Sequence, residues 1–245
     1  VFTVRDSDGN MVRRIKAPAK KGFNRINWDL SYPGFEPIKA SGDMDAGWYA
    51  VPGTYSVSMS KVINGVETAY DQSQSFEVKA IDNRTFPSDD RKADFEFDMK
   101  AGRLYAAMAG ARKYLGELES RIKHVQAATT ETLALDQGTL ALAHQMQRDL
   151  KEIKLTFNGN SVVSKRAEPT PTSVFGYINY LMWSRSESTS PVNGQQKLRF
   201  KRASEGYADV YQRITQLAES VKLTEDAIAK ANGNWMPGMM PSSGK

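Results

Sequence analysis

The hydrophobic residues of this chain change their spacing near residue 85. Before that point, short alternating segments are separated by Gly, Pro and Asn; after it, apolar residues recur at steps of three and four from Phe97 to Val125. A period of two is typical of a strand with one buried face, and a period near three and a half is typical of an amphipathic helix. The sequence therefore predicts an α+β protein with two segregated domains, residues 1–84 and residues 85–245.

The first domain is predicted to be an Ig-like antiparallel β-sandwich. Strands with one apolar face are expected at residues 2–5, 11–15, 22–30, 52–59 and 76–80. The polar loop at residues 6–10 and the Asn64-Gly65 pair are typical of hairpin connections. Five or six short strands at this spacing favour two small sheets packed face to face, with Trp28 at the centre of their core.

A longer loop is expected at residues 32–51. Asp43 and Asp45 in this loop can help to hold a cation, and Trp48 and Tyr49 can stack on a sugar or a peptide. The alternative is a surface loop whose aromatic rings pack back onto the sandwich, because large aromatic side chains are usually buried. Trp48 and Tyr49 are the residues that we nominate for ligand contact.

The second domain is predicted to be an antiparallel four-helix bundle. Pro87 and the acidic residues after it are typical of a helix start, and the stripe that follows predicts a helix of ~40 residues. Further amphipathic segments follow at residues 135–157, 173–181 and 207–231, with a Pro-rich connector at residues 158–172. Four such segments bury their stripes by packing together within one chain. An intermolecular coiled coil is the alternative.

The composition limits the chemistry that this chain can perform. The net charge of +5 is spread over basic residues that alternate with acidic ones, which argues against a nucleic-acid footprint. No apolar run reaches the ~20 residues that span a bilayer. Cysteine is absent, and His124 and His144 lack the spacing of a metal motif. We predict no catalytic residue, no cofactor and no metal site.

Three motifs of the first domain carry a resemblance to a known family. They are Asp-x-Asp-Gly-Asn at residues 6–10, Gly-x-Asn-Arg-x-x-Trp-Asp-Leu at residues 22–30, and Pro-Gly-Thr-Tyr-x-Val at residues 52–57. Their order resembles the Ig-like module of flagellar hook-capping proteins. It is more closely similar to the C-terminal region of bacterial sortilin-like proteins, large exported proteins with Asp-box (BNR) β-propellers that often carry sialidase-like or glycosyl-hydrolase labels. One departure is Asp82-Asn83-Arg84, where that family commonly has Asp-Pro-Arg.

The resemblance implies a role that is not catalytic. The chain is expected to be the C-terminal accessory region of an exported sortilin-like propeller protein, periplasmic, cell-surface or secreted, and to act as a spacer and protein-protein interaction module. Its expected partners are its own upstream β-propeller and a protein bound by the helical bundle. The alternative is a carbohydrate-contacting accessory module of a BNR-repeat glycosyl hydrolase, so that the full-length protein is an enzyme although this piece is not. The first residue is Val rather than Met, and we therefore expect a piece of a longer protein.

Overall fold

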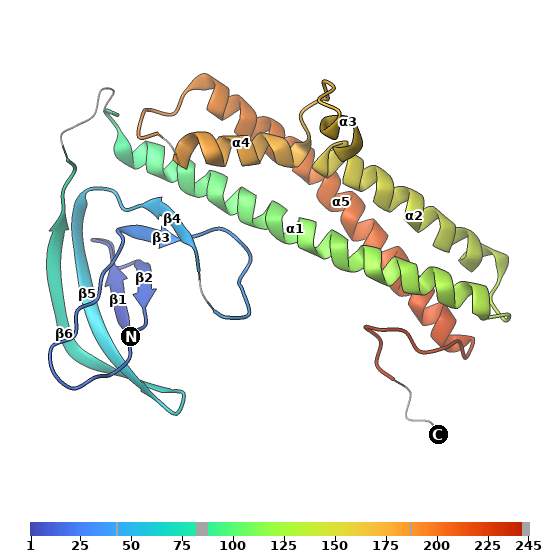
Figure 1. Cartoon of the computed structure of the whole chain (residues 1–245), viewed down its shortest axis with the longest axis horizontal. Helices are drawn as coiled ribbons and strands as arrows, with labels where there is room; N and C mark the ends of the chain where they lie inside the picture. Colours follow the sequence, from blue (N-terminus) through green and yellow to red (C-terminus); the bar gives the residue numbers. More distant parts are fainter. Residues whose placement is uncertain (43, 82–87, 187, 242–245) are drawn as a thin grey trace. The chain divides into compact units, whose positions relative to one another are not determined.

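The structure is a computed structural model that describes residues 1–42, 44–81, 88–186 and 188–241 (Figure 1). Its fold is mixed α+β, with the strands first along the chain and the helices after them. The chain forms two compact units, Val1–Arg103 with Trp183–Val192, and Leu104–Met182 with Asn193–Lys245. Residues 82–87, which contain the predicted domain boundary and the Asp-Asn-Arg junction, lie outside the described residues.

The described strands of the first unit form two antiparallel sheets. One sheet has the strand order β2-β1-β5-β6, and the other pairs β3 with β4. The bounds are β1 Phe2–Arg5, β2 Met11–Ile15, β3 Ser31–Pro33, β4 Ala46–Tyr49, β5 Gly53–Ile63 and β6 Val66–Val78. Both predicted hairpins are confirmed. At the β5–β6 turn, Asn64 and Gly65 have φ angles of 50° and 81°, as a tight two-residue turn requires. An Ig-like topology is not confirmed.

The strand expected at residues 22–30 is absent, and this prediction was wrong. The Asp29 side chain accepts a hydrogen bond from the Ser31 amide at 3.1 Å, and Leu30 has a φ of 57°, so local turn chemistry replaces strand pairing. Trp28 still packs beside the buried Val4, Val12 and Tyr55. Its indole therefore joins the core from a loop rather than from a strand.

Among the described residues, five helices follow the strands. They are α1 Arg91–Glu131, α2 Gln137–Asn158, α3 Ser161–Lys165, α4 Val174–Ser186 and α5 Gly194–Lys230. The first helix has 41 residues, close to the predicted length. Asp90 accepts the Ala93 amide at its start, and Ser173 accepts the Gly176 amide at the start of α4, as N-capping side chains do. The short α3 lies within the predicted connector.

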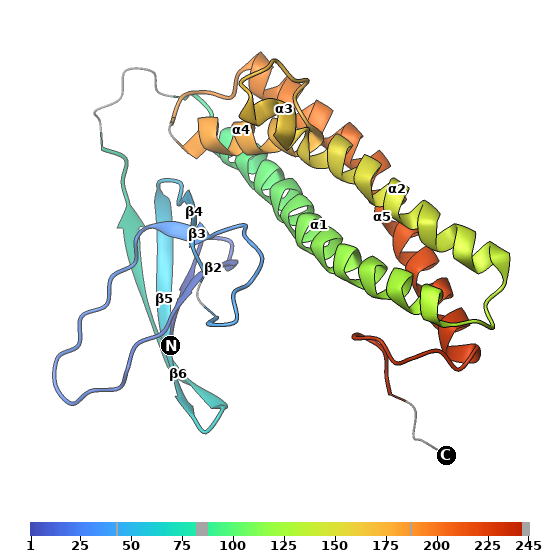
Figure 2. The same cartoon turned by 45° about the vertical axis from the view of Figure 1, so that its right-hand side comes forward.

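In the second unit, α1, α2 and α5 lie side by side (Figures 1 and 2). Lys154 on α2 bonds to Glu119 on α1, and Gln147 bonds to Gln126, so α2 runs antiparallel to α1. The first turn of α4 contacts α1 closer to the N-terminus of α1, where the ring centroids of Phe175 and Tyr105 are 5.6 Å apart. The predicted four-helix bundle is not confirmed, because α2 and α4 meet α1 at different levels instead of each following its length.

The apolar stripes fill the core of this unit. Its buried side chains include Met108, Leu115, Leu118, Ile122, Val125, Met146, Leu150, Ile153, Phe157, Ile178, Leu181, Val210, Ile214, Leu217, Val221 and Ile228. None of the described helices combines the length and the apolar character that crossing a membrane demands.

Candidate functional site

The structure places Trp48 on β4, half-buried, within the first unit. Its indole Nε1 donates a hydrogen bond to the backbone carbonyl of Asp98 at 2.8 Å. Its ring centroid lies 6.2 Å from that of Phe35, within the range of aromatic pairs. The indole N–H of Trp48 thus fastens the β3–β4 hairpin to α1, and its ring packs against Phe35 of the same hairpin.

Tyr49 is placed differently from its neighbour. Successive side chains of a strand point to opposite faces, and Tyr49 is 73% exposed. In the same loop, Asp45 pairs with the Lys39 ammonium at 2.8 Å, so a lysine supplies the positive charge opposite this carboxylate. Asp43 lies outside the described residues. Of the two aromatic residues nominated for ligand contact, Tyr49 is the accessible one.

Trp48 and Tyr49 line a groove of about 710 Å³ within the first unit. Its other wall includes Asp94 and Asp98 of α1, together with Arg185. The volume lies in the range of small-molecule sites. Active and binding sites often combine an aromatic wall with buried charged groups, so this groove is a candidate site.

The buried charges of this groove are paired with each other. The Arg185 guanidinium donates to the two carboxylate oxygens of Asp98 at 2.7 and 2.9 Å. Burial raises the pKa of Asp98 above its ordinary value, although the bonds from Arg185 act in the opposite direction. Because both carboxylate oxygens are engaged, Asp98 serves as a structural ion pair rather than as a free acid or base.

Asp94 lies one turn before Asp98 on α1. Its Oδ1 accepts the Val192 amide at 2.9 Å. Its Oδ2 is buried and has no hydrogen-bond partner among the described residues. Two carboxylates on one helix face do not oppose each other across a scissile bond, so this pair does not form the arrangement of a glycosidase.

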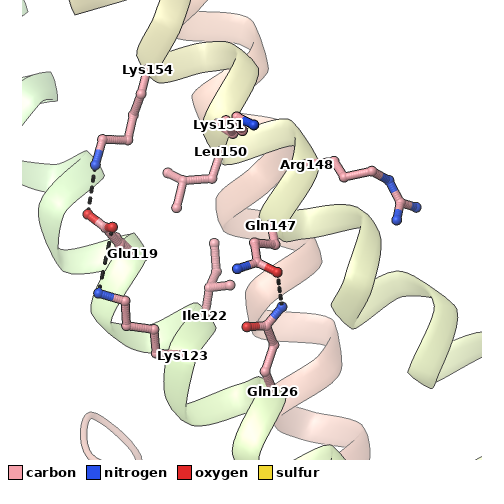
Figure 3. A pocket seen from close by; sticks show the side chains of 9 residues that line it. All are labelled: Glu119, Ile122, Lys123, Gln126, Gln147, Arg148, Leu150, Lys151 and Lys154. Carbon is pink, nitrogen blue, oxygen red and sulfur yellow. Dashed lines mark hydrogen bonds and ion pairs between the residues drawn. The ribbon is translucent and has the colours of Figure 1, made fainter. Parts of the chain in front are cut away.

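A second candidate site is a cleft of about 520 Å³ between α1 and α2 in the second unit (Figure 3). We call it the α1–α2 cleft. It is lined by Glu119, Ile122, Lys123, Gln126, Gln147, Arg148, Leu150, Lys151 and Lys154. Among the described helices, α2 runs closest to α5 rather than to α1. Long polar side chains therefore bridge α1 and α2, with Ile122 and Leu150 between them (Figure 3).

Glu119 is the only carboxylate among the residues that line the α1–α2 cleft. It accepts a hydrogen bond from Lys154 at 2.8 Å and lies 3.6 Å from the Lys123 ammonium. The hydrogen bond from Lys154 is the main cause that lowers the pKa of Glu119. The carboxylate therefore stays ionised under mildly acidic conditions and holds the two lysines on either side of it.

Neutral amides and two further cations complete the cleft. The Gln126 amide donates to the Gln147 side chain at 3.1 Å across the two helices. Arg148 donates to the Gln145 side chain at 3.1 and 2.5 Å. Lys151 forms no ion pair with a described residue. In Figure 3 the side chain of Arg148 extends away from α1.

The described residues contain no group of three or more His, Cys, Asp or Glu side chains that are placed to hold a metal ion. Neither the Asp98–Arg185 pair nor the α1–α2 cleft was predicted from the sequence. A signal for the pair was present, because Arg185 stands four residues after Leu181, a step that keeps it on the buried stripe of α4. A charge on a buried stripe calls for a buried partner.

No protein-family model matches the chain, and no curated protein or solved structure matches it.

Proposed function

We propose that this chain is a non-catalytic C-terminal accessory region of an exported sortilin-like β-propeller protein. In this proposal the first unit is its Ig-like module, which acts as a spacer beside the upstream propeller. The helices, arranged as a bundle, present a surface to a partner protein. The order of the three motifs along the chain, at residues 6–10, 22–30 and 52–57, supports the family assignment.

One observation favours the spacer role over a ligand-binding role for the first unit. The Trp48 indole donates to the Asp98 carbonyl at 2.8 Å, and Asp98 in turn pairs with Arg185. The aromatic residue best suited to stack on a sugar thus holds β4 against α1. Buried, fully paired polar contacts of this kind fix one arrangement of the elements that they join.

The alternative is a carbohydrate-contacting module, and the exposure of Tyr49 favours it. Tyr49 stands at the groove with 73% of its surface accessible, and an exposed phenol ring can stack on a sugar. In this case the glycan contact depends on Tyr49 more than on Trp48. The Trp48 ring is already packed against Phe35.

The two roles are separated by two measurements on the same chain. A glycan array and affinity gels test carbohydrate retention by the natural protein and by Tyr49→Ala. Tyr70→Ala is the matched control, because Tyr70 is also exposed, at 46%, and lies on β6. We expect no retention by any of the three proteins. Retention that is lost in Tyr49→Ala and kept in Tyr70→Ala would support the carbohydrate role instead.

The spacer and interaction role is tested by capture. The immobilised chain is incubated with the recombinant propeller of the same full-length protein and, separately, with periplasmic or secreted proteins of the source cell. We expect capture that requires the second unit. If neither the propeller nor any other protein is retained, the proposed role fails.

A further inference from the structure

The cations of the α1–α2 cleft stand in a row. Arg148, Lys151 and Lys154 follow one another at steps of three on α2, so their directions fan around the helix, from Lys154, which points toward α1, to Arg148, which extends away from it (Figure 3). Lys123 faces them from α1. The row runs for nearly two turns, so it presents an elongated basic wall rather than a single point charge.

The positive charge of this wall is only partly neutralised within the protein. Lys123 and Lys154 share the single carboxylate of Glu119. Arg148 bonds to Gln145, which is neutral, and Lys151 has no ion pair with a described residue. Four cations thus line the cleft with one carboxylate. The excess favours an occupant that carries negative charge.

The rest of the lining narrows the class of occupant. Ile122 and Leu150 lie at the floor of the cleft, beside the amide pair of Gln126 and Gln147, and are already buried, with 1% and 6% of their surface exposed (Figure 3). The accessible lining is therefore mainly polar and charged. No aromatic side chain is among the lining residues, so the cleft lacks a platform on which a sugar or a base would stack. A carboxylate inside the cleft is also unfavourable for a uniform polyanion.

We infer that the α1–α2 cleft binds an acidic segment of a partner protein, an inference that rests on the proposed interaction role of the helices. Carboxylates of the segment pair with Arg148 and Lys151, whose charges have no acidic partner among the described residues. Charge therefore sets the rate and specificity of binding.

The test uses the full chain and a defined probe. The probe is a fluorescent amphipathic peptide with Glu and Leu at helical spacing, and its binding is followed by anisotropy. The double variant Arg148→Glu with Lys151→Glu reverses the two free charges. The matched control, Lys222→Glu with Lys230→Glu, makes the same change in net charge at two exposed lysines of α5. Circular dichroism checks that both variants remain folded, and Lys151→Glu alone serves if the double variant does not.

We expect the peptide to bind the natural chain with an affinity that falls as salt is added. The cleft variant should bind at least about tenfold more weakly, because two charge pairs become repulsive, and the control should stay within about twofold. Equal weakening by both double variants, or no binding by the natural chain, would overturn the inference. So would tighter binding of dextran sulfate or of anionic vesicles than of the peptide.

The same variants separate this inference from the proposed function. If the natural chain and the cleft variant capture the propeller or another partner equally well, the cleft is not the docking site, and the proposed interaction role stands. If the peptide binds in the cleft but no partner is captured, the cleft assignment stands and the proposed role fails. The two ideas therefore fail by different results.

Discussion

Asp98 and Arg185 are 87 residues apart in the chain and form a two-point ion pair, with N–O distances of 2.7 and 2.9 Å. Arg185 also donates to the Ser190 carbonyl at 2.7 Å, and the Asp98 carbonyl accepts the Trp48 indole. One residue of α1 is thereby bonded to β4 and to the end of α4. These contacts all lie within the first unit.

Removal of one member of this pair should destabilise the first unit strongly. Asp98→Ala leaves the Arg185 guanidinium, whose side chain is 4% exposed, without its counter-charge. An uncompensated buried charge costs about 3–5 kcal/mol in the free energy of unfolding. Urea unfolding followed by tryptophan fluorescence measures the loss.

The double variant Asp98→Leu with Arg185→Met is the control for this prediction. It removes both charges and keeps apolar volume, so it should lose less stability than Asp98→Ala alone. In a double-mutant cycle, the stability losses of Asp98→Leu and Arg185→Met alone are compared with the loss of the double variant. If the two single losses add up to the double loss, the two side chains are not coupled.

The mixed α+β class and the long helices were predictable, because they depend on periodicity. The stripe from Phe97 to Val125 predicted one long helix, and the segments expected at residues 135–157 and 173–181 lie close to α2 and to the start of α4. Such signals are local and repeat every turn. The loop at residues 22–30 was mispredicted, since its alternating pattern gives no sign that Leu30 adopts a positive φ.

The candidate sites were less predictable, because they depend on which helices meet. Glu119 and Lys154 are 35 residues apart, and nothing in either segment specifies that they pair. Trp48 could be nominated from its chemistry, but the direction of its ring depends on Asp98 and Phe35. Two charged residues far apart in the chain form an ion pair only if the helices that carry them pack together, and one sequence alone does not reveal which helices do so.

Gly102 on α1 should not tolerate a side chain. A Cβ at this position would stand 2.3 Å from the Phe35 ring, so the ring must move away from the helix. Gly102→Ala should therefore lower the melting temperature, despite the higher helix propensity of Ala. The matched control is Gly116→Ala on the same helix, where a Cβ meets nothing within 4 Å. That variant should gain up to about 1 kcal/mol. Equal effects of the two substitutions would contradict the packing of Phe35 on α1.

Asn193 should contribute to the start of α5. Its side chain accepts the Gln196 amide at 3.0 Å, and the Gln196 side chain accepts the Asn193 amide at 3.0 Å, as in a capping box. Asn193→Ala removes the hydrogen bond from the Gln196 backbone amide to the Asn193 side chain. It should lower the free energy of unfolding by about 1 kcal/mol, measured by thermal unfolding. Gln212→Ala, at an exposed position in the middle of α5, is the comparison and should be near neutral. An unchanged melting temperature in Asn193→Ala would show that the cap does not limit helix stability.

Tyr32 should make the protein sensitive to alkali. Burial raises the pKa of Tyr32 from 10.0 to about 12, so the folded chain keeps a proton that the unfolded chain loses. The contribution is complete below pH 10 and is lost as the pH rises toward 12, because the unfolded state then binds fewer protons. The loss is at most about 2.7 kcal/mol for two pH units, and partial exposure of the ring reduces it.

Tyr32→Phe removes this titration. The slope of unfolding free energy against pH, measured by urea unfolding from about pH 9 to about pH 12, should be shallower in Tyr32→Phe than in the natural chain. Some slope will remain, since burial also raises the pKa of Tyr55 and of Tyr207. Tyr49→Phe removes the hydroxyl of an exposed tyrosine and is the matched control for the substitution itself. If Tyr32→Phe keeps the full slope, the Tyr32 hydroxyl is in contact with solvent and the packing of its ring against Phe95, at 5.0 Å between centroids, does not shield it.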